Sequence, residues 1–182
     1  HQKALYPNSI SATKEDLAIS QSIARQALYL AMQSARLDFP RKIARIKPNL
    51  TPLFEPILAG GSALSDASRP GQSLLLLLDS LQPVGVTTVI LDQNNLLPLL
   101  GAAASQNNIL PVQVMESGAF LSVGTVVSPV VSSAAYGTSI LRAKLTYENG
   151  TEARVDLKYG SLETLPLSSG EVGKLTIQLM RG

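Results

Sequence analysis

The chain has no cysteine and no tryptophan, and its only histidine is His1. Without cysteine it can form neither a disulfide framework nor a thiol nucleophile. We interpret the terminal histidine as the remnant of a purification tag. A Ser-His-acid triad and a zinc site built on histidine and cysteine are therefore excluded as well. We expect no catalytic residue and no metal site in this chain.

Charge and long apolar runs are also scarce. Charged residues make up 15% of the sequence, and the formal net charge is +2. The densest basic group, Arg41, Lys42, Arg45 and Lys47, lacks the aromatic residues or reading motif that nucleic-acid binding requires. The leucine run 74–78 is far too short to cross a bilayer. We therefore expect no nucleic-acid partner and no membrane partner, and the cytoplasm is the expected location.

Aromatic residues are 4% of the chain and hydrophobic residues 45%, so leucine, valine, isoleucine and alanine must fill the core. A length of 182 residues is typical of one or two globular domains. The sequence does not begin with methionine, and it stops at Gly182 just after a strand-like run. We expect an excised piece of a longer protein, and the sequence leaves its oligomeric state open.

The first 110 residues predict a helix followed by strand, helix, strand and helix. Thr13 is a suitable cap for the first helix, which Phe39-Pro40 must end. A strand over 57–59 precedes a helix that begins near Pro70, with Asp66 or Ser68 as its cap. The strand 86–91 follows, with Asp92 at its carboxyl end, where we expect it to close a loop. Asn95 can cap the last helix, 96–105. This order indicates a βαβ unit with parallel strands. The first helix has an apolar stripe at helical spacing, formed by Leu17, Ala24, Leu28, Ala31 and Ala35 and widened by Ile23 and Leu30.

From Pro111 onward the pattern becomes strand-like. Runs at 112–114, 120–127, 139–147, 151–159 and 174–179 are separated by turn-forming residues. They predict a second, all-β domain over 111–182, small, antiparallel and barrel-like. One hairpin can be specified in detail. A three-residue loop, 148–150, pairs Leu145 with Ala153 and keeps apolar residues on one face, with Gly150 left-handed.

The stretch Ile57–Leu64 is the candidate functional element, because an apolar strand there ends in Gly60, Gly61 and Ser62. In open α/β sheets, ligands bind beyond the carboxyl ends of the strands. Backbone amides and a serine hydroxyl at such a place can contact a nucleotide or phosphate. The alternative is a tight turn that needs glycine for steric reasons alone, and the pattern by itself favours this turn. For the later run Gly101–Ala104, close helix packing is likewise the favoured interpretation.

Three segments together carry a family resemblance: 56–64 (PILAGGSAL), 69–72 (RPGQ) and 78–87 (LDSLQPVGVT). They resemble the glutamate-mutase-associated MutL family, which is unrelated to the mismatch-repair protein of that name. That family is similar to the superfamily of actin, heat-shock chaperones and sugar kinases. The resemblance implies that residues 1–110 form a partial ribonuclease-H-like (actin-like ATPase) lobe with βαβα order. It also implies a nucleotide-binding set made of Gly60, Gly61, Ser62, Ala63 and Gly101.

The resemblance further implies an accessory or reactivating partner of adenosylcobalamin-dependent aminomutases. ATP and magnesium would be cofactors of the full-length parent, because the phosphate loops of the superfamily would lie upstream of this chain. We expect the fragment alone to hold no cofactor and to be inactive, and whether the parent hydrolyses ATP stays open. The alternative function is a non-catalytic interaction module that binds no nucleotide.

Overall fold

A computed structural model of the protein describes residues 6, 9, 11–40, 42–47, 49–65, 67, 69–168 and 170–180. His1, Arg41, Asp66 and Ser68, to which predictions were attached above, lie outside these residues. The chain divides into two compact units, 1–129 and 130–182, and each is considered by itself. In the described part, no helix combines the length and the apolar character that a membrane crossing needs.

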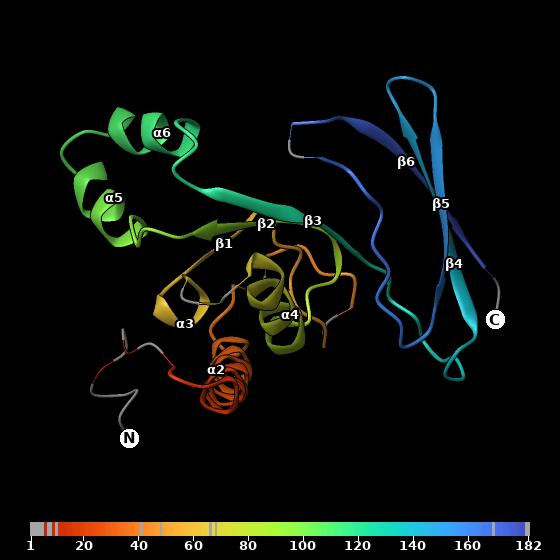
Figure 1. Ribbon diagram of the computed structural model, residues 1–182, viewed down its shortest axis with the longest axis horizontal. Coiled ribbons are helices and arrows are strands. Elements are labelled where there is room, and N and C mark those ends of the chain that lie inside the picture. Colours follow the sequence, from red (N-terminus) through yellow and green to blue (C-terminus); the bar gives the residue numbers. More distant parts are fainter. Residues whose placement is uncertain are drawn as a thin grey trace. The chain divides into compact units, whose positions relative to one another are not determined.

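The first unit is a three-stranded sheet with helices (Figure 1). The strand order is β1-β2-β3; β1 and β2 are parallel, and β2 and β3 are antiparallel. The mixed α/β class and the parallel pair agree with the sequence prediction. The elements are α2 (Lys14–Ala35), β1 (Ile57–Gly60), α3 (Ser62–Ser65), α4 (Pro70–Leu81), β2 (Gly85–Asp92), α5 (Leu97–Ala104), α6 (Ile109–Glu116) and β3 (Leu121–Ser128).

Helix α2 begins as predicted, because the Thr13 hydroxyl accepts a hydrogen bond from the Asp16 amide at 3.0 Å. Its apolar stripe is narrower than predicted. Ile23 and Leu30 are 61% and 57% exposed, whereas Met32, which the stripe omitted, is buried. The regular helix ends at Ala35, and turn hydrogen bonds carry the chain on toward Phe39.

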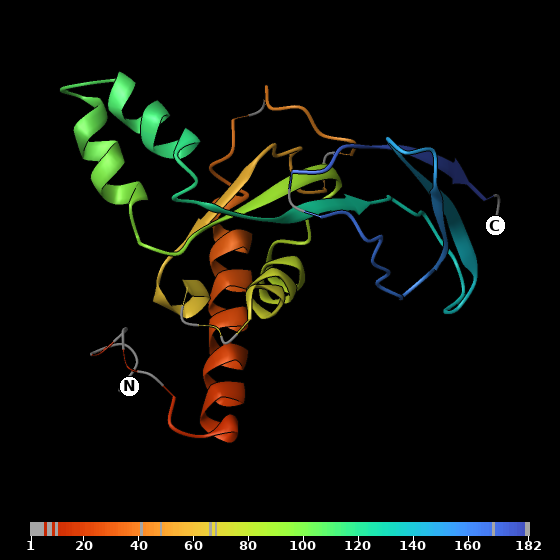
Figure 2. The same cartoon turned by 45° about the horizontal axis from the view of Figure 1, so that its top comes forward.

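Helix α4 has Pro70 in its first turn, where the missing N–H costs nothing. It ends at Leu81 and is capped by Gln82, which takes the left-handed conformation. It packs against α2 and against the sheet, so it is buried on more than one side. The helices α2, α3 and α4 cover the same side of the sheet (Figure 2). The core between them consists of Ala59, Leu64, Leu76, Leu77, Val89 and Leu91.

The segment after residue 110 differs from the prediction. Residues 112–114 lie in α6, a helix, and Pro111 falls in its first turn, where proline is tolerated. A short apolar run fits a buried strand or a helix equally well, and here the helix forms. The predicted strand at 120–127 does form, as β3, but it pairs with β2. The chain consequently divides after Pro129 rather than after residue 110.

The second unit is an open antiparallel sheet of β4 (Ser139–Tyr147), β5 (Glu152–Lys158) and β6 (Gly173–Leu179), in the order β5-β4-β6. The predicted barrel is wrong, because the described residues of this unit supply only these three strands and leave β5 and β6 as edges. The side chains of Leu141, Ala143 and Leu145 on the central strand are buried.

The predicted hairpin is confirmed in its register. Leu145 lies opposite Ala153, and Ala143 lies opposite Val155. The Gly150 amide donates to the Tyr147 carbonyl at 2.9 Å, and φ at Gly150 is +80°. A one-residue slip would have turned the apolar side chains outward, so the apolar alternation fixes the register.

The outer face of this hairpin has paired charges and an expected response to acid. Arg142 donates two hydrogen bonds to Asp156, at 2.7 and 2.9 Å. Hydrogen bonds from Arg154 and Lys144 lower the pKa of Glu152, and the hydrogen bond from Arg142 lowers the pKa of Asp156. Because both pKa values are lowered on folding, the stabilisation is complete above the ordinary carboxyl pKa of about 4. It disappears as pH falls through the lowered values.

We expect carboxyl-carbon NMR titration to give an Asp156 pKa below that of an unfolded peptide. In Arg142→Gln this pKa should return toward the ordinary value, while the backbone amide shifts of β4 and β5 stay close to those of the wild type. An Asp156 pKa that does not respond to loss of Arg142 would show that the ion pair does not persist in solution.

Candidate functional site

Residues 60–63, which we call the glycine corner, lie where two parallel strands end side by side. Gly60 is opposite Asp92 in the β1–β2 register, so the carboxyl ends of both strands meet at one edge of the sheet. Gly60, Gly61 and Ala63 are exposed, and Ser62, the first residue of α3, is half-buried. The structure thus brings four of the five predicted nucleotide-binding residues together at an accessible edge.

The backbone conformation requires glycine at only one of the two glycine positions of the corner. Gly61 has φ = +104°, a conformation that side-chain-bearing residues rarely adopt, and a Cβ there would meet no atom within 4 Å. At Gly60 a Cβ would lie 3.5 Å from the Asp92 Cβ and 3.7 Å from the Leu97 Cδ1, which is ordinary contact. Backbone conformation therefore explains Gly61 but not Gly60.

Asn95 ties the corner to the loop after β2. Its Oδ1 accepts a hydrogen bond from the Gly61 amide at 3.0 Å, and its own φ is +52°. The prediction that Asn95 caps α5 is wrong, because its side chain is directed to Gly61 instead. The Gly61 amide is therefore already engaged within the chain. The Gly61 carbonyl is engaged as well, accepting from the Leu64 and Ser65 amides at 2.9 and 3.0 Å.

Asp92, and not Asn95, binds the free amides at the start of α5. Its carboxylate accepts hydrogen bonds from the Leu96 and Leu97 amides at 2.9 and 2.8 Å and from the Asn94 amide at 3.3 Å. The residue is only 1% exposed, so these donors satisfy a carboxylate taken out of water. The expectation that Asp92 closes a loop is confirmed. The signal was an acidic residue directly after an apolar strand and just before a helix.

Gly101 lies one helical turn beyond Leu97, the residue that borders Gly60, and so on the same side of α5. It is exposed, and a Cβ there would meet no atom within 4 Å. The close packing favoured for Gly101–Ala104 is therefore wrong for Gly101. Ala102 and Ala104 are exposed too, and only Ala103 is half-buried. Space at Gly101 is open to solvent.

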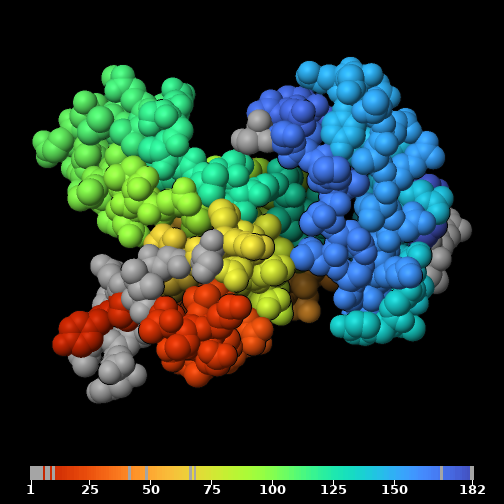
Figure 3. Space-filling view, viewed as in Figure 1, coloured from red at the N-terminus to blue at the C-terminus, as the bar shows by residue number. Residues whose placement is uncertain are grey.

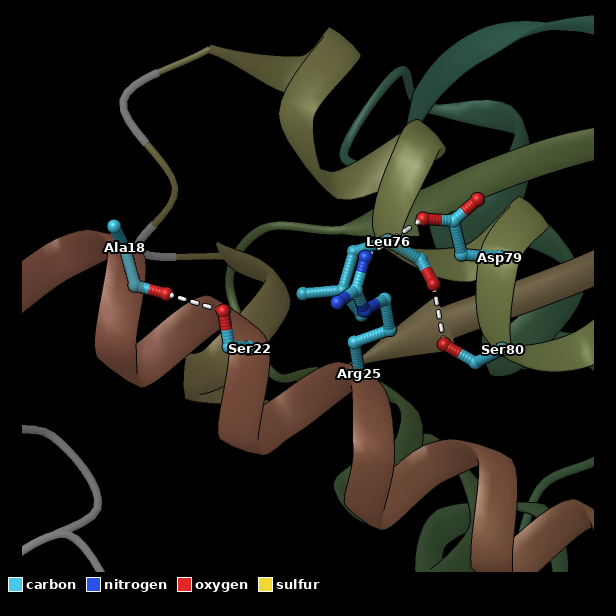
Figure 4. Close-up of polar contacts among 6 residues, drawn as sticks. All are labelled: Ala18, Ser22, Arg25, Leu76, Asp79 and Ser80. Atoms are coloured by element: carbon cyan, nitrogen blue, oxygen red, sulfur yellow. Dashed lines mark hydrogen bonds and ion pairs between the residues drawn. The ribbon is translucent and has the colours of Figure 1, made fainter.

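A second concave site lies between α2 and α4 and has no local sequence signal. It is a groove of about 270 Å³ in which Arg25 and Asp79 form an ion pair at 3.3 Å (Figure 4). Both charged side chains are more than half exposed, so the pair contributes little stability. The groove is lined by Ala18, Gln21, Ser22, Arg25, Gln72, Leu75, Leu76 and Asp79.

The hydroxyl groups near this groove are used within their own helices. Ser22 Oγ donates to the Ala18 carbonyl at 2.8 Å, and Ser80 Oγ donates to the Leu76 carbonyl. Neither serine has a base aligned against it, so the groove holds no activated nucleophile. In the described part of the chain, no three acidic or histidine side chains gather closely enough to hold a metal ion.

Comparisons of this chain with protein-family models, with curated proteins and with solved structures found no match. The resemblance to the MutL family therefore rests on the three sequence segments quoted above, and the nucleotide site stays a prediction.

Proposed function

We propose that this chain is a fragment of an actin-like ATPase and forms the adenosine side of its nucleotide site. The observation that carries this proposal is the exposed corner at Gly60 and Gly61, where two parallel strands end together. Such edges are where open α/β sheets bind ligands. Gly61 and Gly101 both have open space where a side chain would otherwise project. A sugar or base could approach the backbone closely at these two positions.

Two residues next to the corner, Asp92 and Asn95, support its conformation. Asp92 holds the first turn of α5, and Asn95 holds the Gly61 amide, so the corner is preorganised by the chain itself. A nucleotide that used the Gly61 amide would have to displace Asn95, which would reduce the net gain in binding. Contacts by van der Waals approach to the backbone at Gly61 and Gly101 are therefore the expected mode. We further propose, on the resemblance alone, that the parent assists an adenosylcobalamin-dependent aminomutase in the cytoplasm.

The alternative is an interaction module without a nucleotide site, and one observation favours it. The positive φ of Gly61 and its hydrogen bond to Asn95 account for that glycine without any ligand. Of the three glycines in the predicted nucleotide-binding set, Gly60 and Gly101 are then the two that the fold itself does not require. The two functions therefore differ in what they predict for substitutions at these two positions.

The test is nucleotide binding by the full-length parent, measured by titration calorimetry with ADP and with ATP plus magnesium. Gly60→Val and Gly101→Leu place bulk at the corner, so the dissociation constant should rise at least about tenfold, equivalent to about 1.4 kcal/mol. Neither position has a positive φ that would strain the new residue.

Gly71→Leu is the matched control, because Gly71 is also exposed, lies in helix α4 and would offer a Cβ open space. Its affinity for nucleotide should equal that of the wild type. Unchanged affinity in Gly60→Val and Gly101→Leu would contradict the adenosine-side assignment. A parent that binds no nucleotide at all would favour the interaction module.

A further inference from the structure

Helices α5 and α6 form a helical hairpin whose surface is unusually apolar. The two helices pack against each other, and their atoms form one continuous green surface in Figure 3. Ile109, Val112 and Met115 recur every three residues along α6, so they share one side of it. We call the large exposed apolar residues of this hairpin the hairpin patch. They are Leu99, Ile109, Leu110, Val112 and Met115, with exposed fractions of 67%, 61%, 40%, 53% and 43%.

The hairpin does not bury enough apolar side chains to explain its apolar composition. Each helix has eight residues, and helices this short are not stable in water without tertiary packing. In α5 only Leu100 is buried, and α6 has no buried residue among those described. An exposed apolar surface on so small an element is typical of a site that another molecule covers.

The charges of the hairpin restrict what that molecule can be. Residues 93–115 contain no Asp, Glu, Lys or Arg, and the one charged residue of the two helices is Glu116 at the end of α6. Helices that lie on lipid surfaces carry Lys or Arg on their polar face, and this hairpin has neither. A strongly charged protein partner would find at most the single carboxylate of Glu116 here. The surface is instead complementary to another neutral, apolar surface, and an identical hairpin provides one.

We propose that two copies of this chain associate through the hairpin patch, so that α5 and α6 of each copy form a four-helix contact. A two-fold axis places the same patch on both sides and needs no second surface. The exposed small residues Ala102 and Ala104 allow the helices to approach closely. This proposal is independent of the nucleotide site.

The area of the hairpin patch determines how tightly the two copies are expected to bind. If each large apolar residue has a full area of roughly 180 Å², the exposed fractions amount to about 500 Å² per copy and about 1,000 Å² for two copies. That is the lower limit for a specific interface, so the dimer should be weak, with a dissociation constant on the order of micromolar.

Sedimentation velocity over roughly 1–200 μM chain tests the proposal, with the range chosen to span that dissociation constant. The wild type should shift from monomer to dimer as concentration rises. Leu99→Lys and Val112→Lys each place a charge in the contact, and the dissociation constant should rise at least tenfold. Leu162→Lys is the matched control, because Leu162 is 60% exposed and lies outside the hairpin, so this variant should dimerise like the wild type.

Far-UV circular dichroism verifies that each variant keeps the wild-type helix and strand content, and a second pair, Ile109→Lys and Met115→Lys, replaces any variant that does not. A wild type that stays monomeric throughout, or a dimer that Leu99→Lys and Val112→Lys leave intact, would overturn the proposal. So would patch-dependent binding of the monomer to vesicles of phosphatidylcholine and phosphatidylserine, because the patch would then contact lipid.

Discussion

Replacing Asp92 by alanine should lower the free energy of unfolding of the first unit by about 2–3 kcal/mol. The carboxylate is buried and is the acceptor for the Leu96 and Leu97 amides at the start of α5. Alanine would leave these amides without their partner in a site that water reaches poorly. The loss therefore exceeds that of an exposed helix cap.

Amide hydrogen exchange of β2 measures this change within the first unit, since the slowest amides report the free energy of global opening. Asp92→Asn keeps one acceptor oxygen and should lose less than Asp92→Ala. Asp79→Ala removes an exposed carboxylate that pairs with Arg25, and it should cost less than about 1 kcal/mol. If Asp92→Ala cost no more than Asp79→Ala, Asp92 would not be the residue that holds the corner together.

Leu91→Ala should lower the free energy of unfolding of the same unit by about 3 kcal/mol, within the usual range for buried leucine. Leu91 is 2% exposed and belongs to the core cluster with Ala59, Leu76 and Leu77. The strand holds it between β1 and β3, so neighbouring side chains cannot fully collapse into the space that alanine leaves. Both the lost apolar burial and the residual cavity contribute to the cost.

Leu75→Ala provides the comparison, because Leu75 is in the same unit and is 49% exposed. Its truncation should cost about 1 kcal/mol or less. Urea unfolding followed by far-UV circular dichroism measures both variants, with hydrogen exchange assigning the loss to the first unit. Equal losses for Leu91→Ala and Leu75→Ala would place the core elsewhere than between α4 and the sheet.

Several parts of the fold follow from local sequence. Thr13, Pro70 and the β-branched run of β2 predicted the start of α2, the start of α4 and the position of β2, because capping, proline geometry and strand alternation act over a few residues. The β4–β5 register followed from two alternating strands around Gly150. In each case the deciding interaction lies close in sequence, so the pattern alone was sufficient.

Other parts depend on contacts between distant residues. Residues 112–114 have the composition of a strand, yet they lie in α6, a helix that packs beside α5. The bond from Gly61 to Asn95 and the pair Arg25–Asp79 join residues far apart in sequence, so spacing could not predict them. Asp92 was predicted only to close a loop, because the amides that donate to it belong to the first turn of α5, and the sequence does not show where that turn lies. The number of strands that close a barrel is likewise a property of the whole sheet.

Because the α5–α6 segment lies between β2 and β3, its length can change without affecting the sheet. These strands are antiparallel neighbours, and Leu91 lies directly opposite Leu121, so residues 93–120 leave the sheet and return to nearly the same point. Neighbouring antiparallel strands are commonly joined by two to five residues. The sheet's pairing therefore does not depend on the length of this excursion. Insertions or deletions in the turns of this segment can therefore leave the strand framework unchanged.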